Sequence, residues 1–110
     1  MKALVYEAPR VMSLRDVERP APGRGEVLLR VAYSGICGSE LSGFLGQNSL
    51  RTPPLIFGHE LSGTVAETGP ATAGVEVGAR VTVNPLVSCG RCEYCVTARH
   101  QLCRDRLLLG

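Results

Sequence analysis

The sequence predicts a mainly β domain, built from short strands that form a barrel or a sandwich. Glycine occurs 13 times and proline 7 times, at the short intervals typical of a chain with many tight turns. Between these turn residues lie short runs in which apolar residues alternate with others, as they do in half-buried strands. Several short strands of this kind favour a β architecture over a helical one.

The clearest strand is predicted over residues 26–33, where alternate residues are apolar and Glu26 and Arg30 lie on the other face. Further strands are predicted over residues 3–6, 12–17, 60–67 and 79–83. A short helix is expected after the strand over residues 26–33, with Ser39 as its N-cap and Glu40 in its first turn.

The composition argues against nucleic-acid and membrane partners. The formal net charge is only +2, and the aromatic residues are three Tyr and two Phe without Trp, so the basic stripe and the stacking platform of nucleic-acid binders are missing. No stretch approaches the roughly 18 apolar residues of a membrane helix, and the N-terminus resembles a strand instead of a signal peptide. We therefore expect a cytoplasmic protein. One basic patch is interpreted as a solvated loop face and comprises Arg99, His100, Arg104 and Arg106.

Four of the five cysteines cluster near the end of the chain, at Cys89, Cys92, Cys95 and Cys103. The odd total and the lack of a signal peptide argue against a disulfide framework. Four thiolates suit Zn²⁺, which accepts a closed tetrahedral shell with no open position for chemistry. The cluster therefore predicts a structural zinc site that orders its loop.

Other interpretations of this cluster remain open. One alternative is that the four thiols bind no metal. Another is that they hold an iron–sulfur cluster, because bacterial ferredoxins share the two-residue spacing between cysteines. The seven residues between Cys95 and Cys103, and the lack of a second set of cysteines, disfavour the iron–sulfur cluster. A zinc ribbon that binds nucleic acid is disfavoured by the low charge and the few aromatic residues.

A second group of candidate ligands lies upstream. Cys37 follows the predicted strand over residues 26–33 in a glycine-flanked turn, and His59 and Glu60 begin the strand over residues 60–67. A thiolate, an imidazole and a carboxylate are ligand types of catalytic zinc, which keeps one position open for water or substrate. Each residue alone is more often an ordinary structural residue, so the interpretation depends on their convergence at strand ends.

The ordered set Gly35-Ile36-Cys37-Gly38-Ser39, Gly58-His59-Glu60 and the four clustered cysteines resembles the zinc-containing medium-chain dehydrogenase/reductase family, which includes alcohol and polyol dehydrogenases. The resemblance implies a GroES-like, partly open β-barrel with short helices and a zinc-binding loop. In that family a Rossmann domain follows and binds the nicotinamide cofactor, but no G-x-G-x-x-G run follows a strand here. Residues 1–110 are therefore expected to be the GroES-like domain, truncated before the Rossmann domain.

By this resemblance the residues of the catalytic zinc are Cys37, His59 and Glu60, the last either a direct ligand or a neighbour of the metal. Ser39 corresponds to the hydroxyl that passes on the substrate proton. Two positions depart from the family, since Glu40 stands where Asp is usual and Ser42 where many alcohol dehydrogenases have a histidine of the proton path. Glu40 is still expected to orient His59 through its second ring nitrogen.

The implied function is oxidation of a small-molecule alcohol or polyol by hydride transfer to NAD or NADP, which the missing domain would bind. Zinc would occupy a catalytic and a structural site. The full-length enzyme is expected to be a homo-oligomer, and the fragment alone to be inactive. The alternative, from another class of protein, is a GroES-like structural or interaction module with a purely structural zinc site, although such modules need neither Cys37 nor the cysteine cluster.

Overall fold

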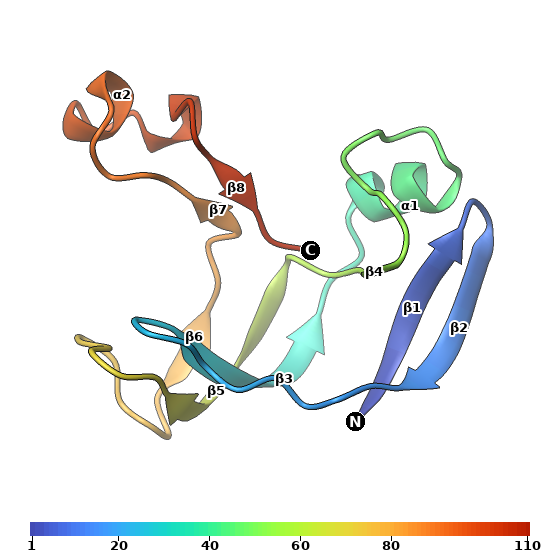
Figure 1. Ribbon diagram of the computed structural model, residues 1–110, viewed down its shortest axis with the longest axis horizontal. Helices are drawn as coiled ribbons and strands as arrows, with labels where there is room; N and C mark the ends of the chain where they lie inside the picture. Colours follow the sequence, from blue (N-terminus) through green and yellow to red (C-terminus); the bar gives the residue numbers. More distant parts are fainter.

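The computed structural model describes residues 1–110 as three small β-sheets with short helices (Figure 1). The strand orders are β2-β1-β4, β3-β5-β6 and β7-β8. The bounds are β1 Lys2–Ala8, β2 Val11–Asp16, β3 Val27–Ser34, α1 Gly38–Phe44, β4 Leu55–Ile56, β5 Leu61–Thr68, β6 Arg80–Thr82, β7 Leu86–Val87, α2 Glu93–Val96, a 3-10 helix His100–Leu102, and β8 Leu107–Leu108. Neither α-helix, of seven and four residues, has the length and apolar character needed to cross a membrane.

The β2-β1-β4 sheet contributes three of the six buried apolar residues, all of them from β1. Ala3, Val5 and Tyr6 of β1 are buried, and the Tyr6 ring stacks on Phe57 with the ring centroids 4.8 Å apart. Stacked aromatic pairs contribute beyond the area that they bury. Since Phe57 lies two residues before His59, this stack fixes the chain segment that carries the imidazole.

The β3-β5-β6 sheet explains why Cys37 and His59 come together. β3 and β5 are antiparallel, and Ser34 at the end of β3 pairs with Leu61 at the start of β5. The pairing continues one step further, because the Gly35 N–H donates to the Glu60 carbonyl at 2.7 Å. The residues just after β3 and just before β5 therefore lie at the same edge of the sheet.

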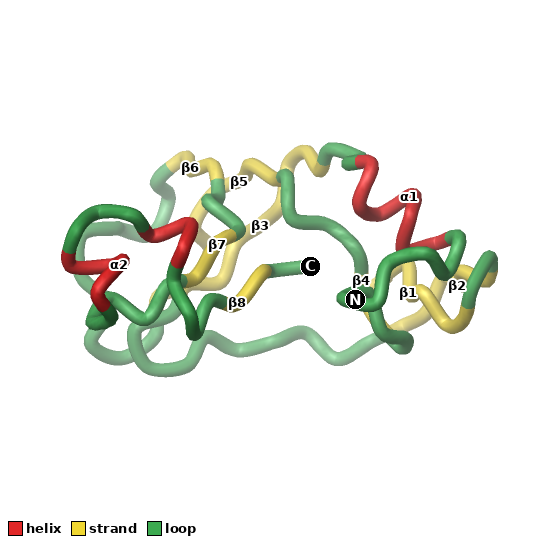
Figure 2. Tube along the Cα trace, turned by 90° about the horizontal axis from the view of Figure 1, so that it is seen from above, coloured by secondary structure: helices red, strands yellow, loops and turns green.

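The segment from β7 to β8, with α2 and the 3-10 helix between them, forms what we call the cysteine lobe (residues 86–108). It projects from the two larger sheets, at the upper left of Figure 1. Seen from above, the C-terminus lies between this lobe and the β1–β2 hairpin (Figure 2). Only Cys95 and Cys103 are buried within the lobe, so it has no apolar core of its own.

The prediction of a mainly β, partly open GroES-like fold is confirmed, because the three sheets do not close into one barrel. The five predicted strands correspond to β1, β2, β3, β5 and β6. The strands β4 and β7 were not predicted, since two residues are too few to show alternation. The predicted N-cap was wrong: α1 is capped by Cys37, and Ser39 lies in the first turn of the helix.

Candidate metal sites

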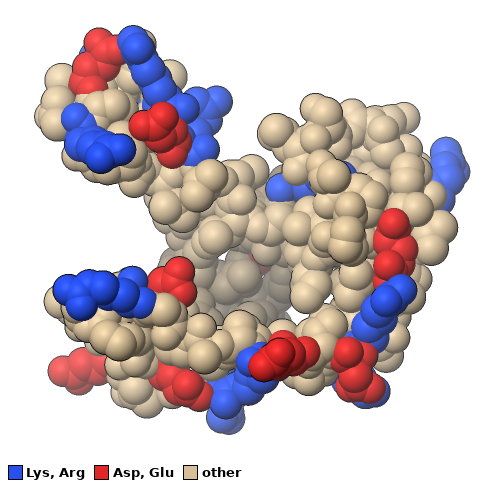
Figure 3. All heavy atoms as spheres, in the orientation of Figure 1, with Lys and Arg blue, Asp and Glu red and all other residues tan.

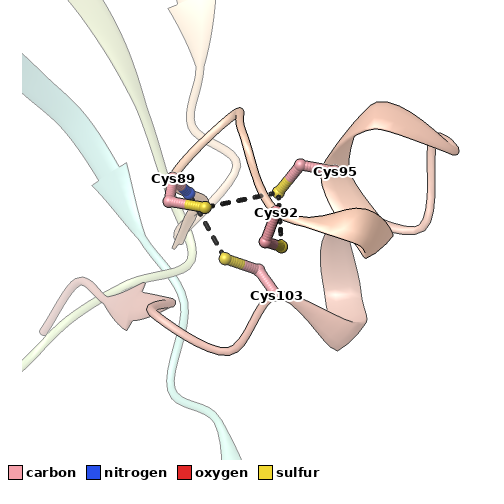
Figure 4. Close-up of side chains that lie close together, drawn as sticks. All are labelled: Cys89, Cys92, Cys95 and Cys103. Carbon is pink, nitrogen blue, oxygen red and sulfur yellow. Dashed lines mark hydrogen bonds between the residues drawn. The ribbon is translucent and has the colours of Figure 1, made fainter.

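The cysteine lobe brings its four thiols to one point (Figure 4). Cys89 follows β7, Cys92 is the N-cap of α2, Cys95 lies within that helix, and Cys103 follows the 3-10 helix. Gly90, at a φ of 73°, allows the tight turn between Cys89 and Cys92. The short helices thus direct the four cysteine side chains toward one another.

The spacing of the sulfur atoms fits a tetrahedral zinc ion. Four sulfurs at about 2.3 Å from one ion lie about 3.8 Å from each other. The observed separations are 3.6 Å between Cys92 and Cys95 and 3.9 Å between Cys89 and Cys95. None of the four forms a disulfide. The Cys89 N–H also donates to the Cys103 sulfur at 3.3 Å, an interaction that favours a thiolate.

The pKa values of these thiols diverge, as expected of negative charges crowded together. Hydrogen bonding by the Cys95 backbone N–H lowers the pKa of Cys92 to about 6. Hydrogen bonding by the backbone of Arg91, and then of Cys92, lowers the pKa of Cys89. Burial, followed by the Cys92 side chain, raises the pKa of Cys95 to about 11. The lobe therefore supplies some thiolates at neutral pH, and a bound cation would complete the deprotonation.

The second group consists of Cys37, Glu40 and His59, whose ligand atoms lie within 4.8 Å of one another. The Glu40 carboxylate joins the other two residues. Its Oε2 accepts the Cys37 N–H at 2.7 Å, and its Oε1 lies in contact with Nδ1 of His59. Glu40 and His59 are buried, so these interactions are shielded from solvent.

The donor set of this group fits a metal ion. Glu40 Oε1 is fully buried, yet no group donates a well-directed hydrogen bond to it. If an ion bound Nε2 of His59, the ring proton would sit on Nδ1, where Glu40 Oε1 is placed to accept it. A thiol, an imidazole and a carboxylate match the ligand chemistry of zinc.

The structure does not bring Glu60 into this group. Glu60 is exposed, and a Cβ added at Gly35 would lie 2.9 Å from its Oε2, so its carboxylate lies over the turn after β3. Together with His59 it lines a hollow of about 530 Å³. Ligation by Glu60 thus stays a prediction, and Glu40 is the carboxylate that the fold places beside Cys37 and His59.

Ser39 and Arg51 complete the surroundings of this group. The Arg51 guanidinium is buried; its Nη2 lies 3.4 Å from Ser39 Oγ and 3.3 Å from His59 Nδ1. The Ser42 hydroxyl donates to the Ser39 carbonyl at 3.0 Å, away from the Ser39 hydroxyl. Sequence reasoning missed Arg51, because a single arginine before two prolines has no distinctive spacing.

Comparison with known proteins extends these observations. The family model described as the alcohol dehydrogenase GroES-like domain matches residues 23–110. L-threonine 3-dehydrogenase of Streptomyces coelicolor is 40% identical over the whole chain, and D-arabitol-phosphate dehydrogenase of Enterococcus avium is 39% identical; the chain covers 33% and 32% of these two relatives. A crystal structure of an alcohol dehydrogenase from Escherichia coli CFT073 with NADH superposes with a TM-score of 0.91 at 36% identity, over 100% of this chain and 32% of that one. The chain thus spans about a third of their length.

Proposed function

The chain belongs to the alcohol dehydrogenase GroES-like domain family, and from this premise we propose that it is the zinc-binding, substrate-side domain of a zinc-dependent alcohol or polyol dehydrogenase. The observation that carries the proposal is the meeting of Cys37 and His59, which leave two different strands and approach within 4.8 Å with Glu40. A purely structural module has no need of a thiol and an imidazole held together at one sheet edge.

The residues around Cys37 and His59 would have different roles in alcohol oxidation. Cys37 and His59 would hold zinc, which when bound supplies a Lewis acid that makes an alcohol oxygen more acidic. Glu40 orients the His59 ring and accepts the backbone N–H of Cys37, the N-cap of α1. Ser39 Oγ accepts the proton of the alcohol and passes its own hydrogen onward to water. Glu60 is proposed to complete the ligand set or to neighbour the metal from the hollow that it shares with His59.

The cysteine lobe is proposed to hold a second zinc ion that serves structure alone. Its four ligands are all thiols at tetrahedral spacing, which leaves no position for a substrate. Because the lobe buries only two of its side chains, metal binding would supply much of the free energy that orders it.

The nicotinamide cofactor, NAD or NADP, is proposed to bind outside residues 1–110, in a further domain of the full-length protein. The chain spans only about a third of the length of its relatives, and several large apolar side chains are exposed, including Ile36 at 91% and Leu50 at 76%. Exposed apolar surface of this kind is typical of an interface. We place the full-length enzyme in the cytoplasm as a homo-oligomer that acts on a small-molecule alcohol, without nucleic-acid or membrane partners.

The proposal is tested on the full-length protein with two cysteine variants. Cys37→Ser should abolish alcohol-dependent reduction of NAD or NADP while the protein keeps its fold and the zinc of the cysteine lobe. Cys92→Ser should lower thermal stability and zinc content while the catalytic group stays intact. Full activity in zinc-replete Cys37→Ser would contradict the proposal. Inactivity of the wild-type protein with two bound zinc ions, whatever the alcohol, would instead favour the structural module.

A further inference from the structure

Arg51 is one of three buried polar or charged residues in the chain, with Glu40 and His59. Only 5% of its surface is exposed. A buried guanidinium loses its hydration, and proteins offset that loss by pairing the charge. No carboxylate oxygen lies within 4.0 Å of the Arg51 nitrogens. Glu40 and Arg51 both contact Nδ1 of His59, but no ion pair joins them directly.

The hydrogen-bonding capacity of Arg51 is largely unused. Nη2 makes two long contacts, with Ser39 Oγ and His59 Nδ1. Nε is fully buried without any partner. Nη1 has no partner either and is absent from the fully buried unpaired atoms, so it keeps access to the space beside it. A guanidinium has five N–H donors arranged as a fork that matches an oxyanion.

The space beside Arg51 is a hollow of about 490 Å³ between the loop that follows α1 and the cysteine lobe. The lobe itself carries several basic side chains, at the upper left of Figure 3. Its volume lies in the range of small-molecule pockets. Two more arginines line it, Arg104 and Arg106, and no acidic residue does; the other lining residues are Leu50, Leu86, Leu107 and Leu108.

The two lobe arginines differ in how they are engaged. Arg104 is paired with Glu93 and lies over the Tyr94 ring, 5.8 Å from its centroid, so its charge is already matched. Arg106 donates only to the Cys103 carbonyl, at 3.1 Å, and faces no carboxylate. Arg51 and Arg106 are thus two unmatched cations on one hollow, which makes its potential attractive to anions.

The Arg51 side chain is held in position before any ligand arrives. The Arg51 backbone N–H donates to the Asn48 carbonyl at 3.1 Å, which closes a turn. Its stem packs over Gly43 of α1, where an added Cβ would lie 2.7 Å from Arg51 Cγ. A cation fixed in this way loses little conformational entropy on binding.

We infer that Arg51 and Arg106 form an oxyanion-binding site next to the candidate catalytic group, and that the substrate is an alcohol carrying a phosphate or carboxylate group. Arg51 contacts both Ser39 and His59, so an anionic group held by Arg51 lies within one small molecule's length of them. A charge-assisted hydrogen bond from Nη1 of Arg51 to the oxyanion would pair the buried charge, which has no other anionic partner. The leucines would pack against the carbon chain between the two ends. This inference rests on the proposed dehydrogenase function.

The test uses full-length, zinc-loaded protein and inorganic phosphate as the probe. Isothermal titration should show phosphate binding, and phosphate should compete with the alcohol in steady-state kinetics. Arg51→Met and Arg106→Met should each weaken phosphate binding about ten- to a hundredfold, and Arg51→Lys should lose less. Arg24→Met is the matched control, because Arg24 is exposed and does not line the hollow. This variant should bind phosphate as the wild type does.

Substrate preference distinguishes the two sources of the oxyanion. The values of kcat/KM are compared for a neutral polyol, its phosphate ester and a hydroxy acid of similar length. The kcat/KM of one of the two charged substrates should exceed that of the neutral polyol by at least tenfold, and Arg106→Met should lose this preference. Because Arg106 is exposed, its substitution is not expected to disturb folding.

Three results would overturn the inference. They are no phosphate binding, binding that does not compete with the alcohol, and equal losses in Arg24→Met and the two hollow variants. If the neutral polyol is the best substrate, the inference fails while the dehydrogenase function stands. If phosphate binds but no alcohol reduces NAD or NADP, both fail.

Discussion

Replacing Glu40 by glutamine tests whether this buried carboxylate positions the catalytic ligands. Glu40 is 7% exposed, accepts the Cys37 N–H at 2.7 Å and contacts His59 Nδ1. A glutamine oxygen can still accept the Cys37 N–H, but its NH₂ group cannot accept a proton from His59. The charged hydrogen bond from the Cys37 N–H and the favourable charge at the helix start contribute about 2 to 4 kcal/mol together. Loss of a carboxylate that orients a metal-bound histidine typically lowers metal affinity about 10- to 100-fold.

The assay is competition of the full-length protein with a zinc chelator, monitored by the metal content of each site. In Glu40→Gln the catalytic zinc should leave at about 10- to 100-fold lower chelator concentration, while the zinc of the cysteine lobe serves as an internal reference and should not move. Glu40→Asp keeps the charge and should lose less affinity. A Glu40→Gln protein that folds and retains wild-type zinc affinity would show that Glu40 has no part in placing His59.

Two further predictions concern packing and thiol chemistry. Gly63→Ala should destabilise the protein by about 1 to 3 kcal/mol, measured as a lower thermal midpoint, because the added Cβ overlaps the Arg30 carbonyl across the β3–β5 pairing; an unchanged midpoint would mean that the strands move apart freely. In zinc-free protein at pH 7, iodoacetamide should modify Cys92 faster than Cys95. The thiolate of Cys92 forms as the pH rises through about 6, whereas that of Cys95 requires a pH near 11; the reverse order in peptide mapping would contradict the assigned shifts.

The cysteine lobe was predictable because its ligands are local in sequence. Three of the four cysteines are separated by two residues each, and a short helix converts that spacing directly into proximity. The strands were predictable for a similar reason, since each strand shows its own alternation of apolar and other residues. The observed bounds of β1, β2, β3, β5 and β6 differ from the predicted bounds by at most two residues at either end.

The surroundings of Cys37 and His59 were less predictable, because they depend on pairing between distant segments. Chain proximity favoured Glu60 as the carboxylate, since it directly follows His59. The chain bends at Glu60, just before β5, and Glu60 lies exposed, whereas Glu40 reaches His59 from a helix nineteen residues earlier. Arg51 could not be predicted either, because no local sequence pattern indicates that a loop arginine will be buried.

The location of Glu40 also couples the formation of α1 to the assembly of the catalytic group. The first N–H groups of a helix need acceptors, and the Glu40 carboxylate supplies one to Cys37, the residue that would bind the metal through its sulfur. The other oxygen of the same carboxylate contacts His59. Any change that unwinds the first turn of α1 therefore displaces the thiol and releases the imidazole at once. A helix of only seven residues is too short to be stable by itself, so contacts at its start, including those that would hold the metal ligands, are among those that keep it folded.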